Sequence, residues 1–335
     1  MPDSADNSLH ALNQAGASFQ SQFHQRWRHL TDPHVRALAW LIDAPDLLDP
    51  QAPQWRGQIA GLPSDAGHDA REWLAALDRE PAELHAWLNV QPFARLGRYA
   101  EKLMAFYFTH QGMLFAHGVQ VRAGKNETVG EFDFLLHSGA GLAHWEFATK
   151  FYLLQSPRGR GPAGPKADYF VGPNLADTLG AKMTKILHRQ LSLGRHPAAQ
   201  VHLPLPLSAA QALVKGWLFY HRDDAPPRTL GVSELHCRGF WCALGELEAP
   251  PGRLYTVLPR LRWLAPAKIK IEAAITGEAL RELLVAHFMQ DTMPVMVALL
   301  EECGEYAEET DRGFIVPDDW GSRARDRIRP VDSPA

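Results

Sequence analysis

The sequence predicts an α/β protein, of the α+β kind, built around a central β-hairpin with helices on either side. Two apolar runs, residues 128–136 and 142–154, flank the short turn sequence SGAG at 138–141. This pattern is typical of two antiparallel strands joined by a tight loop. Apolar residues recur at helical spacing in residues 96–110 before the hairpin and in 175–193 after it, so we expect a helix on each side.

Composition and charge are those of an ordinary globular protein. The chain has 335 residues, is 46% hydrophobic and 21% charged, and carries a net charge of -4, which excludes a protein that is basic throughout but not a local basic surface. Its three cysteines are too few and wrongly spaced for a disulfide framework or a zinc site. Without an export signal or a run of about 18 uncharged apolar residues, we expect a cytoplasmic protein with no membrane partner.

The chain divides into five predicted segments. Residues 1–16 are polar, and we expect them to be disordered. Residues 17–92 predict a helical N-terminal cap with no sign of chemistry, and residues 93–222 form a core that contains the hairpin. Residues 223–320 predict a C-terminal α/β extension packed on that core, and the arginine-rich tail 321–335 is expected to be disordered.

Charged side chains lie in both strands of the predicted hairpin. Because side chains alternate along a strand, Glu131 and Asp133 share one face of the first strand, and His144, Glu146 and Lys150 share one face of the second. The opposite faces are apolar, with Phe132, Phe134 and Leu136 in the first strand and Trp145, Phe147, Thr149, Phe151 and Leu153 in the second. Buried charge is costly unless it is paired or binds a metal, so these residues form either a salt-bridge cluster or a cation site.

Polar residues on neighbouring elements extend this cluster. Glu101 projects at the margin of the apolar face of the helix 96–110. We expect Glu131 at the rim of the site rather than as a ligand, and His144 as a partner of an acid. Gln190 lies on the apolar side of the helix 175–193, where it either hydrogen-bonds the site or is a buried core glutamine.

A local excess of positive charge follows the hairpin. From residue 150 to residue 196 there are eight Lys or Arg residues and two acids. Most of them lie on a glycine- and proline-rich loop and on one strip of the following helix, namely Arg158, Arg160, Lys166, Lys182, Lys185 and Arg189. These six are candidate contacts for the phosphates of a nucleic acid, and the alternative is an ordinary solvated face.

The central stretch resembles the core of the PD-(D/E)XK nuclease superfamily. It shares a helix glutamate, the strand sequence GEFDF at 130–134, a short turn, and Glu146 followed by a lysine. More closely, residues 96–193, with GEFDFLL, HWEFATKFY and VGPN, resemble a bacterial family catalogued as domain of unknown function 1853, and this resemblance covers most of the chain. The superfamily resemblance implies a restriction-endonuclease-like αβββαβ core, here with an N-terminal helical cap and additional C-terminal strands and a helix.

The resemblance also implies which residues form the site. Asp133 and Glu146 match the strand acids that bind the metal, and Glu101 matches the helix glutamate that often joins them. Carboxylates that hold Mg²⁺ (or Mn²⁺) leave positions open for a phosphate oxygen and water. The implied catalytic residues are Asp133, Glu146 and Lys150, with Lys150 near the attacking water.

The chain departs from the superfamily pattern at the lysine. The superfamily places it two residues after the acid, where this chain has Ala148, and Lys150 comes four residues after Glu146. Both positions share a face, but four residues of strand span about 13 Å and two span about 7 Å.

Two functions follow as hypotheses. The first is Mg²⁺-dependent hydrolysis of phosphodiester bonds in DNA or RNA. The second, favoured by the displaced lysine, is a catalytically inactive nuclease-like fold that binds nucleic acid or a protein partner. It predicts salt-sensitive binding without cleavage. A third possibility is an enzyme that acts on a small phosphorylated substrate and has no affinity for polynucleotides.

Overall fold

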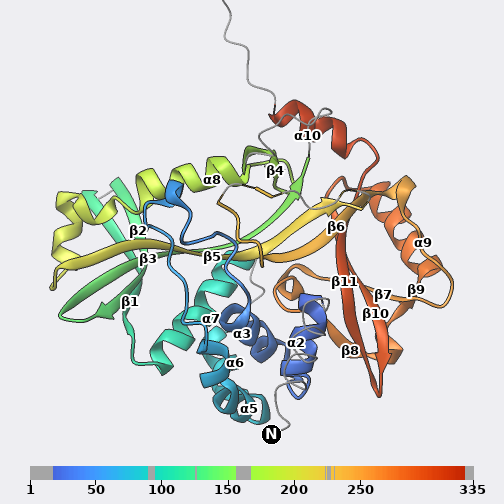
Figure 1. Ribbon diagram of the computed structural model, residues 1–335, viewed down its shortest axis with the longest axis horizontal. Helices are drawn as coiled ribbons and strands as arrows, with labels where there is room; N and C mark the ends of the chain where they lie inside the picture. Colours follow the sequence, from blue (N-terminus) through green and yellow to red (C-terminus); the bar gives the residue numbers. More distant parts are fainter. Residues whose placement is uncertain are drawn as a thin grey trace, which may run out of the picture.

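The computed structural model describes residues 18–89, 95–124, 127–155, 167–222, 224, 228–229 and 231–328. Within these residues the protein is a mixed α/β structure with one large, mostly antiparallel sheet of eleven strands (Figure 1). The strand order is β1-β2-β3-β5-β6-β11-β10-β7-β9, while β4 pairs with β3 and β8 pairs with β11.

The N-terminal part of the sheet contains the predicted hairpin. It consists of β1 (Leu114–Gly124), β2 (Glu127–Ser138), β3 (Gly141–Leu154) and β5 (Leu207–His221). Neighbours β1, β2 and β3 are antiparallel, whereas β5 lies parallel to β3. The turn between β2 and β3 uses Gly139 at φ +55°, a backbone conformation that favours glycine. The hairpin prediction is therefore confirmed.

The C-terminal strands continue the same sheet. They are β6 (Cys237–Ala243), β7 (Leu254–Val257), β8 (Lys268–Lys270), β9 (Ile275–Thr276), β10 (Val295–Cys303) and β11 (Tyr306–Val316), with the short β4 (Phe170–Val171) beside β3. Strand β6 joins the two parts, because it pairs in parallel with both β5 and β11. The core and the extension predicted from the sequence thus share one sheet.

Helices cover both faces of the sheet. The α-helices are α2 (Phe19–Trp27), α3 (Pro33–Asp43), α4 (Ala66–Asp69), α5 (Arg71–Arg79), α6 (Ala82–Leu88), α7 (Leu96–His110), α8 (Leu179–Lys185), α9 (Gly277–Phe288) and α10 (Trp320–Ile328). Helices α3 and α7 lie against one face and α8 against the other (Figure 1). The helices predicted for residues 17–92 are present, and Asp32 caps α3 directly before Pro33, which is suited to the first helical turn.

Short helical turns connect these elements. The 3₁₀ turns are η1 (Pro53–Trp55), η2 (Ala167–Tyr169), η4 (Leu193–Arg195), η5 (Pro197–His202), η6 (Leu244–Glu246), η7 (Arg260–Arg262) and η8 (Ile271–Ala273), and η3 (Ile186–Gln190) is a π-helical turn.

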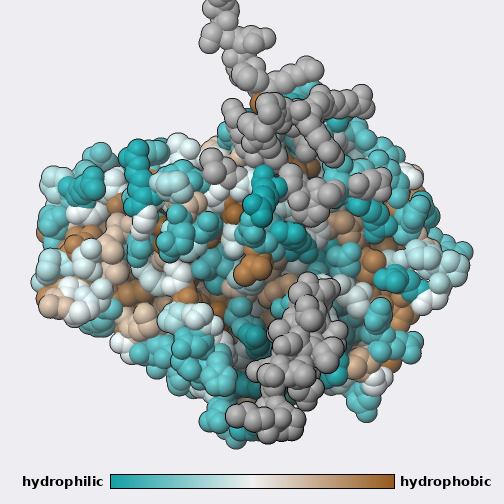
Figure 2. Space-filling model, viewed as in Figure 1, coloured by the Kyte–Doolittle hydropathy of each residue, from teal (hydrophilic) through white to brown (hydrophobic). Residues whose placement is uncertain are grey.

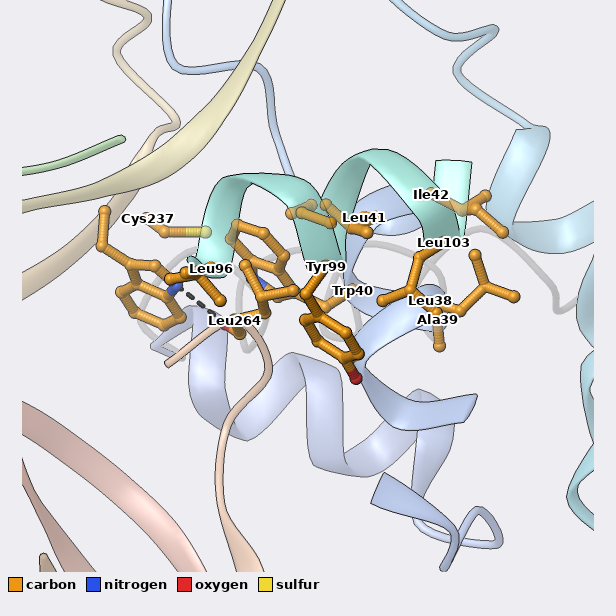
Figure 3. Close-up of a cluster of buried hydrophobic side chains, with 14 of the residues drawn as sticks. Leu38, Ala39, Trp40, Leu41, Ile42, Leu96, Tyr99, Leu103, Cys237 and Leu264 are labelled. Atoms are coloured by element: carbon orange, nitrogen blue, oxygen red, sulfur yellow. Dashed lines mark hydrogen bonds between the residues drawn. The ribbon is translucent and has the colours of Figure 1, made fainter. Parts of the chain in front are cut away.

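The main core fixes α7 beneath the sheet. Figure 3 shows Leu96, Tyr99 and Leu103 of α7 in a cluster with residues 38–42 of α3. The indole of Trp217, on β5, stacks on Trp40 and donates a hydrogen bond to the Leu264 carbonyl oxygen at 2.9 Å. Because α7 packs on α3 and on strands β1, β2 and β3, its remaining polar side chains have fixed positions relative to the strands.

The outer surface is mostly polar, as Figure 2 shows for one face, where hydrophobic residues are scattered among hydrophilic ones. In the part of the chain that the structure describes, no helix combines the length and the apolar character needed to span a bilayer.

The prediction of a disordered tail from residue 321 is wrong as far as Ile328. Trp320 and Ala324 of α10 are fully buried, and the Trp320 indole donates to the Pro173 carbonyl oxygen at 2.8 Å. Trp320, Ala324 and Ile328 recur at a spacing of four, so a narrow apolar face docks this otherwise polar helix. The predicted disorder of residues 1–16 lies outside the described residues, as do residues 329–335.

The helix predicted for residues 175–193 begins later than expected. Leu175 has φ +61°, which is not helical, and the Asn174 side chain accepts the Ala176 N–H at 3.2 Å in a turn. Thr178 caps α8 instead, and α8 passes into η3 at Ile186. The π-helical turn changes the direction of its own side chains relative to a continued α-helix, including that of Gln190 at its end.

Candidate metal centre

The candidate site lies where β2 and β3 separate. Their ladder runs from the Ser138–Gly141 pair to the Phe134–Trp145 pair, and in the described residues it ends there. The Asp133 carboxylate then accepts the Phe147 N–H at 2.9 Å, so a side chain replaces the next backbone partner. Strand β3 pairs with β4 only from Leu153 onward, which leaves room for polar side chains in between.

Side-chain alternation in β2 breaks at this point. Phe132 packs with Val121 and Leu135 on the face of the sheet opposite to α7, whereas Phe134 and Leu136 pack in the main core beside α7. The expectation that Phe132 and Phe134 share a face is therefore wrong. The physical reason is the local irregularity where the ladder ends and Asp133 turns toward β3.

Three carboxylates converge beside this irregularity. Glu101 on α7 and both Glu131 and Asp133 on β2 each contribute an oxygen to a group whose members lie within 4.8 Å of one another. Within the described residues this is the one group of three or more acids, histidines or cysteines close enough to share a metal ion. All three residues are half-buried. Glu131 therefore belongs to the cluster and not merely to its rim, and the signal was its shared strand face with Asp133.

Glu146 adjoins this cluster but is held by other partners. Its carboxylate accepts a hydrogen bond from His144 Nε2 at 3.0 Å and another from the Gln190 side-chain amide. The Glu146 carboxylate is also within electrostatic range of Asp133. The predicted role of His144 as the partner of an acid is confirmed, and Gln190 hydrogen-bonds the site. Among the described residues, the buried His144 Nδ1 and Gln190 Oε1 have no hydrogen-bond partner.

The acids of the candidate site are partly desolvated by burial, and their negative charges repel one another. Burial is the main cause that raises the pKa of Glu101 to about 7, and the charges of Asp133 and Glu131 contribute to the same rise. Burial likewise raises the pKa of Asp133 to about 7, with Glu146 as the second cause. Burial also raises the pKa of Glu146 to about 7, although the neighbouring Asp133 side chain and the Lys182 charge oppose this. Additional positive charge would therefore stabilise the ionised site.

Lys150 lies on β3, four residues beyond Glu146. Its side chain makes no hydrogen bond or ion pair with any residue that the structure describes. Burial and the Lys182 charge lower the pKa of Lys150 to about 8, against the opposing charges of Asp177 and Asp133. Lys150 is thus a half-buried cation within electrostatic range of Asp133.

The predicted phosphate contacts are only partly described. Lys182 on α8 is half-buried, and its charge acts on both Glu146 and Lys150. Lys185 and Arg189 are exposed on the same helical segment. The other three predicted contacts, Arg158, Arg160 and Lys166, lie outside the described residues.

Gly216 determines how closely β5 approaches Lys150. A Cβ at Gly216 would lie 2.0 Å from the Lys150 carbonyl oxygen. Because a backbone atom cannot move aside cheaply, we expect Gly216→Ala to lower the free energy of unfolding by about 3 kcal/mol. At Gly97, on α7, a Cβ would meet nothing within 4 Å, so Gly97→Ala is the control and should cause no loss. Urea unfolding measures both, and a Gly216→Ala protein as stable as the wild type would contradict this packing.

Comparison with known proteins gives a family and no described activity. No curated protein and no solved structure matches the chain. The family described as "Domain of unknown function (DUF1853)" matches residues 36–316, a range that contains every residue of the candidate site. The match confirms the closer of the two resemblances seen in the sequence. The chain belongs to the DUF1853 family.

Proposed function

We propose that the protein hydrolyses phosphodiester bonds in DNA or RNA with Mg²⁺ or Mn²⁺ as cofactor. The observation that carries this proposal is the group formed by Glu101, Glu131 and Asp133, whose oxygens lie within 4.8 Å of one another. Mg²⁺ prefers carboxylate oxygens, and half-buried acids without a counter-charge are costly. A divalent cation would supply the charge that this group lacks.

The order of elements supports the proposal. Helix α7, the antiparallel strands β1 to β3, helix α8, and β5 parallel to β3 follow one another in the chain. The same order is implied by the resemblance to PD-(D/E)XK nucleases. We therefore propose that residues 93–222 are a restriction-endonuclease-like core and that residues 223–320 extend it.

In this proposal each side chain has a separate task. Glu101 and Asp133 hold the cation, as the resemblance implies, and Glu131 joins them. Glu146 acts beside Asp133 and is oriented by His144 and Gln190. Lys150 provides a positive charge near the reacting phosphate and the attacking water. The cation, when bound, would polarise the phosphate and lower the pKa of water.

Two observations favour the second function, an inactive nuclease-like fold that binds nucleic acid. Both oxygens of Glu146 are already held, by His144 and by Gln190, and Lys150 is displaced along β3 from the superfamily position. A cleavage assay separates the two functions. Single- and double-stranded DNA and RNA are incubated with Mg²⁺ or Mn²⁺, and with EDTA as control. Cation-dependent products support hydrolysis, whereas salt-sensitive binding without products supports the alternative.

Cation binding should depend on pH. Glu101 and Asp133 have folded-state pKa values of about 7, above their ordinary values of 4.5 and 3.8. The folded protein therefore holds these two protons more tightly than the unfolded chain does. Their contribution to the free energy of unfolding is complete below about pH 4 and is lost as the pH rises through about 7. Because ligands must lose their protons, we expect Mn²⁺ to raise the Tm more at about pH 8 than at about pH 6. Equal shifts at both pH values, or no shift at the higher one, would contradict this.

A further inference from the structure

A cavity of about 290 Å³ opens beside β3, at the stretch of the strand that carries Lys150. Its walls come from the start of α7, from residues 149–152 of β3, from the loop 172–177 and from the segment that contains Arg260 and Trp263. Lys150 belongs both to this cavity and to the electrostatic surroundings of Asp133. A ligand in the cavity would therefore lie beside Lys150, whose charge also acts on Asp133.

The cavity is lined by an excess of positive charge. Arg95, Lys150 and Arg260 line it, and Asp177 is the one acid in its wall among the described residues. Asp177 accepts a hydrogen bond from the Tyr152 hydroxyl at 3.0 Å. The side chains of Arg95 and Lys150 have no hydrogen bond or ion pair within the described residues, and the Arg260 guanidinium lies over the Trp263 ring at 5.5 Å. None of the three cations therefore forms an ion pair with an acid in the part of the chain that the structure describes.

The backbone at the start of α7 adds to the positive potential of the cavity. The fifteen-residue helix α7 begins in the cavity wall, and its N-cap residue Arg95 makes no side-chain capping hydrogen bond. The first N–H groups of a helix carry partial positive charge and bind phosphate groups readily. Lys182 and Lys185 add charge from α8, since both act on Lys150.

We propose that this cavity binds a phosphate of the polynucleotide, one that neighbours the bond placed at the carboxylates. Guanidinium groups bind phosphate oxygens through paired hydrogen bonds, which suits Arg95 and Arg260. The volume accommodates one phosphate with its sugar and does not accommodate a duplex. This inference rests on the proposed function, because it assigns the cavity to the same substrate.

Binding without cleavage tests the cavity directly. The probe is a fluorescent single-stranded DNA oligonucleotide, with Ca²⁺ in place of Mg²⁺, and anisotropy reports binding to the full-length protein. Loss of one charged contact typically costs about tenfold in affinity, so we expect roughly that effect for Arg260→Gln and for Arg95→Gln. Arg253→Gln is the matched control, because Arg253 is exposed and lies outside the cavity wall, and it should bind as the wild type does.

The outcomes separate this proposal from the proposed function. If both cavity variants bind DNA as tightly as Arg253→Gln does, the cavity is not a phosphate site, even where the protein cleaves nucleic acid. If the cavity variants bind weakly and the wild type still cleaves nothing, the cavity stands and hydrolysis fails. A calorimetric titration with pyrophosphate tests whether the cavity binds a small phosphate compound instead. Binding of pyrophosphate together with no binding of any DNA would overturn the assignment to a polynucleotide.

Discussion

Asp133→Asn is expected to reduce cation-dependent cleavage by roughly 10³-fold, because it removes a charged ligand worth several kcal/mol of transition-state stabilisation. The amide oxygen of asparagine can still accept the Phe147 N–H that Asp133 binds at 2.9 Å, so the strands keep their arrangement. Initial rates on a labelled oligonucleotide measure the effect, and unfolding curves check that the variant is folded.

Glu127→Gln is the matched control for this change. Glu127 is an exposed acid on the same strand, at the end of β2 that pairs with Gly124. We expect its activity to equal that of the wild type. Cleavage that survives in Asp133→Asn would contradict the proposed chemistry. If Asp133→Asn does lose activity, an equal loss in Asp133→Ala would confirm that the carboxylate is required.

Arg312→Met is expected to lower the free energy of unfolding by about 3–5 kcal/mol, since it leaves a buried charge without its partner. Arg312 on β11 is fully buried and donates to both oxygens of Glu309, at 2.6 and 2.8 Å. It also donates to the carbonyl oxygens of Trp263 and Ala265, and its guanidinium lies over the Trp217 ring at 4.1 Å. Arg312 therefore holds the segment that contains Trp263, which lines the cavity, against strand β11.

A surface ion pair is the control for Arg312. Arg323 and Asp319, one turn apart at α10, lie 3.6 Å apart and are exposed. Arg323→Met should change the free energy of unfolding by less than about 0.5 kcal/mol. Urea unfolding distinguishes the two variants, and an Arg312→Met protein with wild-type stability would show that the buried pair does not stabilise the fold.

Much of the site could be predicted because its residues lie in local patterns. The apolar runs and the glycine-containing turn fix the β2–β3 hairpin, and alternation places Glu131 with Asp133. The contribution of Glu101 followed from the family resemblance and from its helix margin. The break in alternation at Asp133 could not be predicted, because it depends on a hydrogen bond between this side chain and the backbone of Phe147 across the strand pair.

Other features depend on contacts between distant segments. Arg95 and Arg260 are far apart in the sequence and meet only through the packing of α7 and η7 in one cavity wall. The continuation of the sheet through β6 likewise requires pairing with both β5 and β11. Helix α10 carried a readable signal in the spacing of Trp320, Ala324 and Ile328, but its many arginines made the tail resemble a disordered segment.

The most direct measurement is a calorimetric titration of Mn²⁺ into the full-length protein at about pH 8, for the wild type and for Glu101→Gln. If carboxylates from α7 and β2 hold one cation together, the wild type binds Mn²⁺ and Glu101→Gln binds it at least about tenfold more weakly. Glu127→Gln should bind as the wild type does. Failure of the wild type to bind Mn²⁺, or undiminished binding by Glu101→Gln, would contradict a shared metal centre.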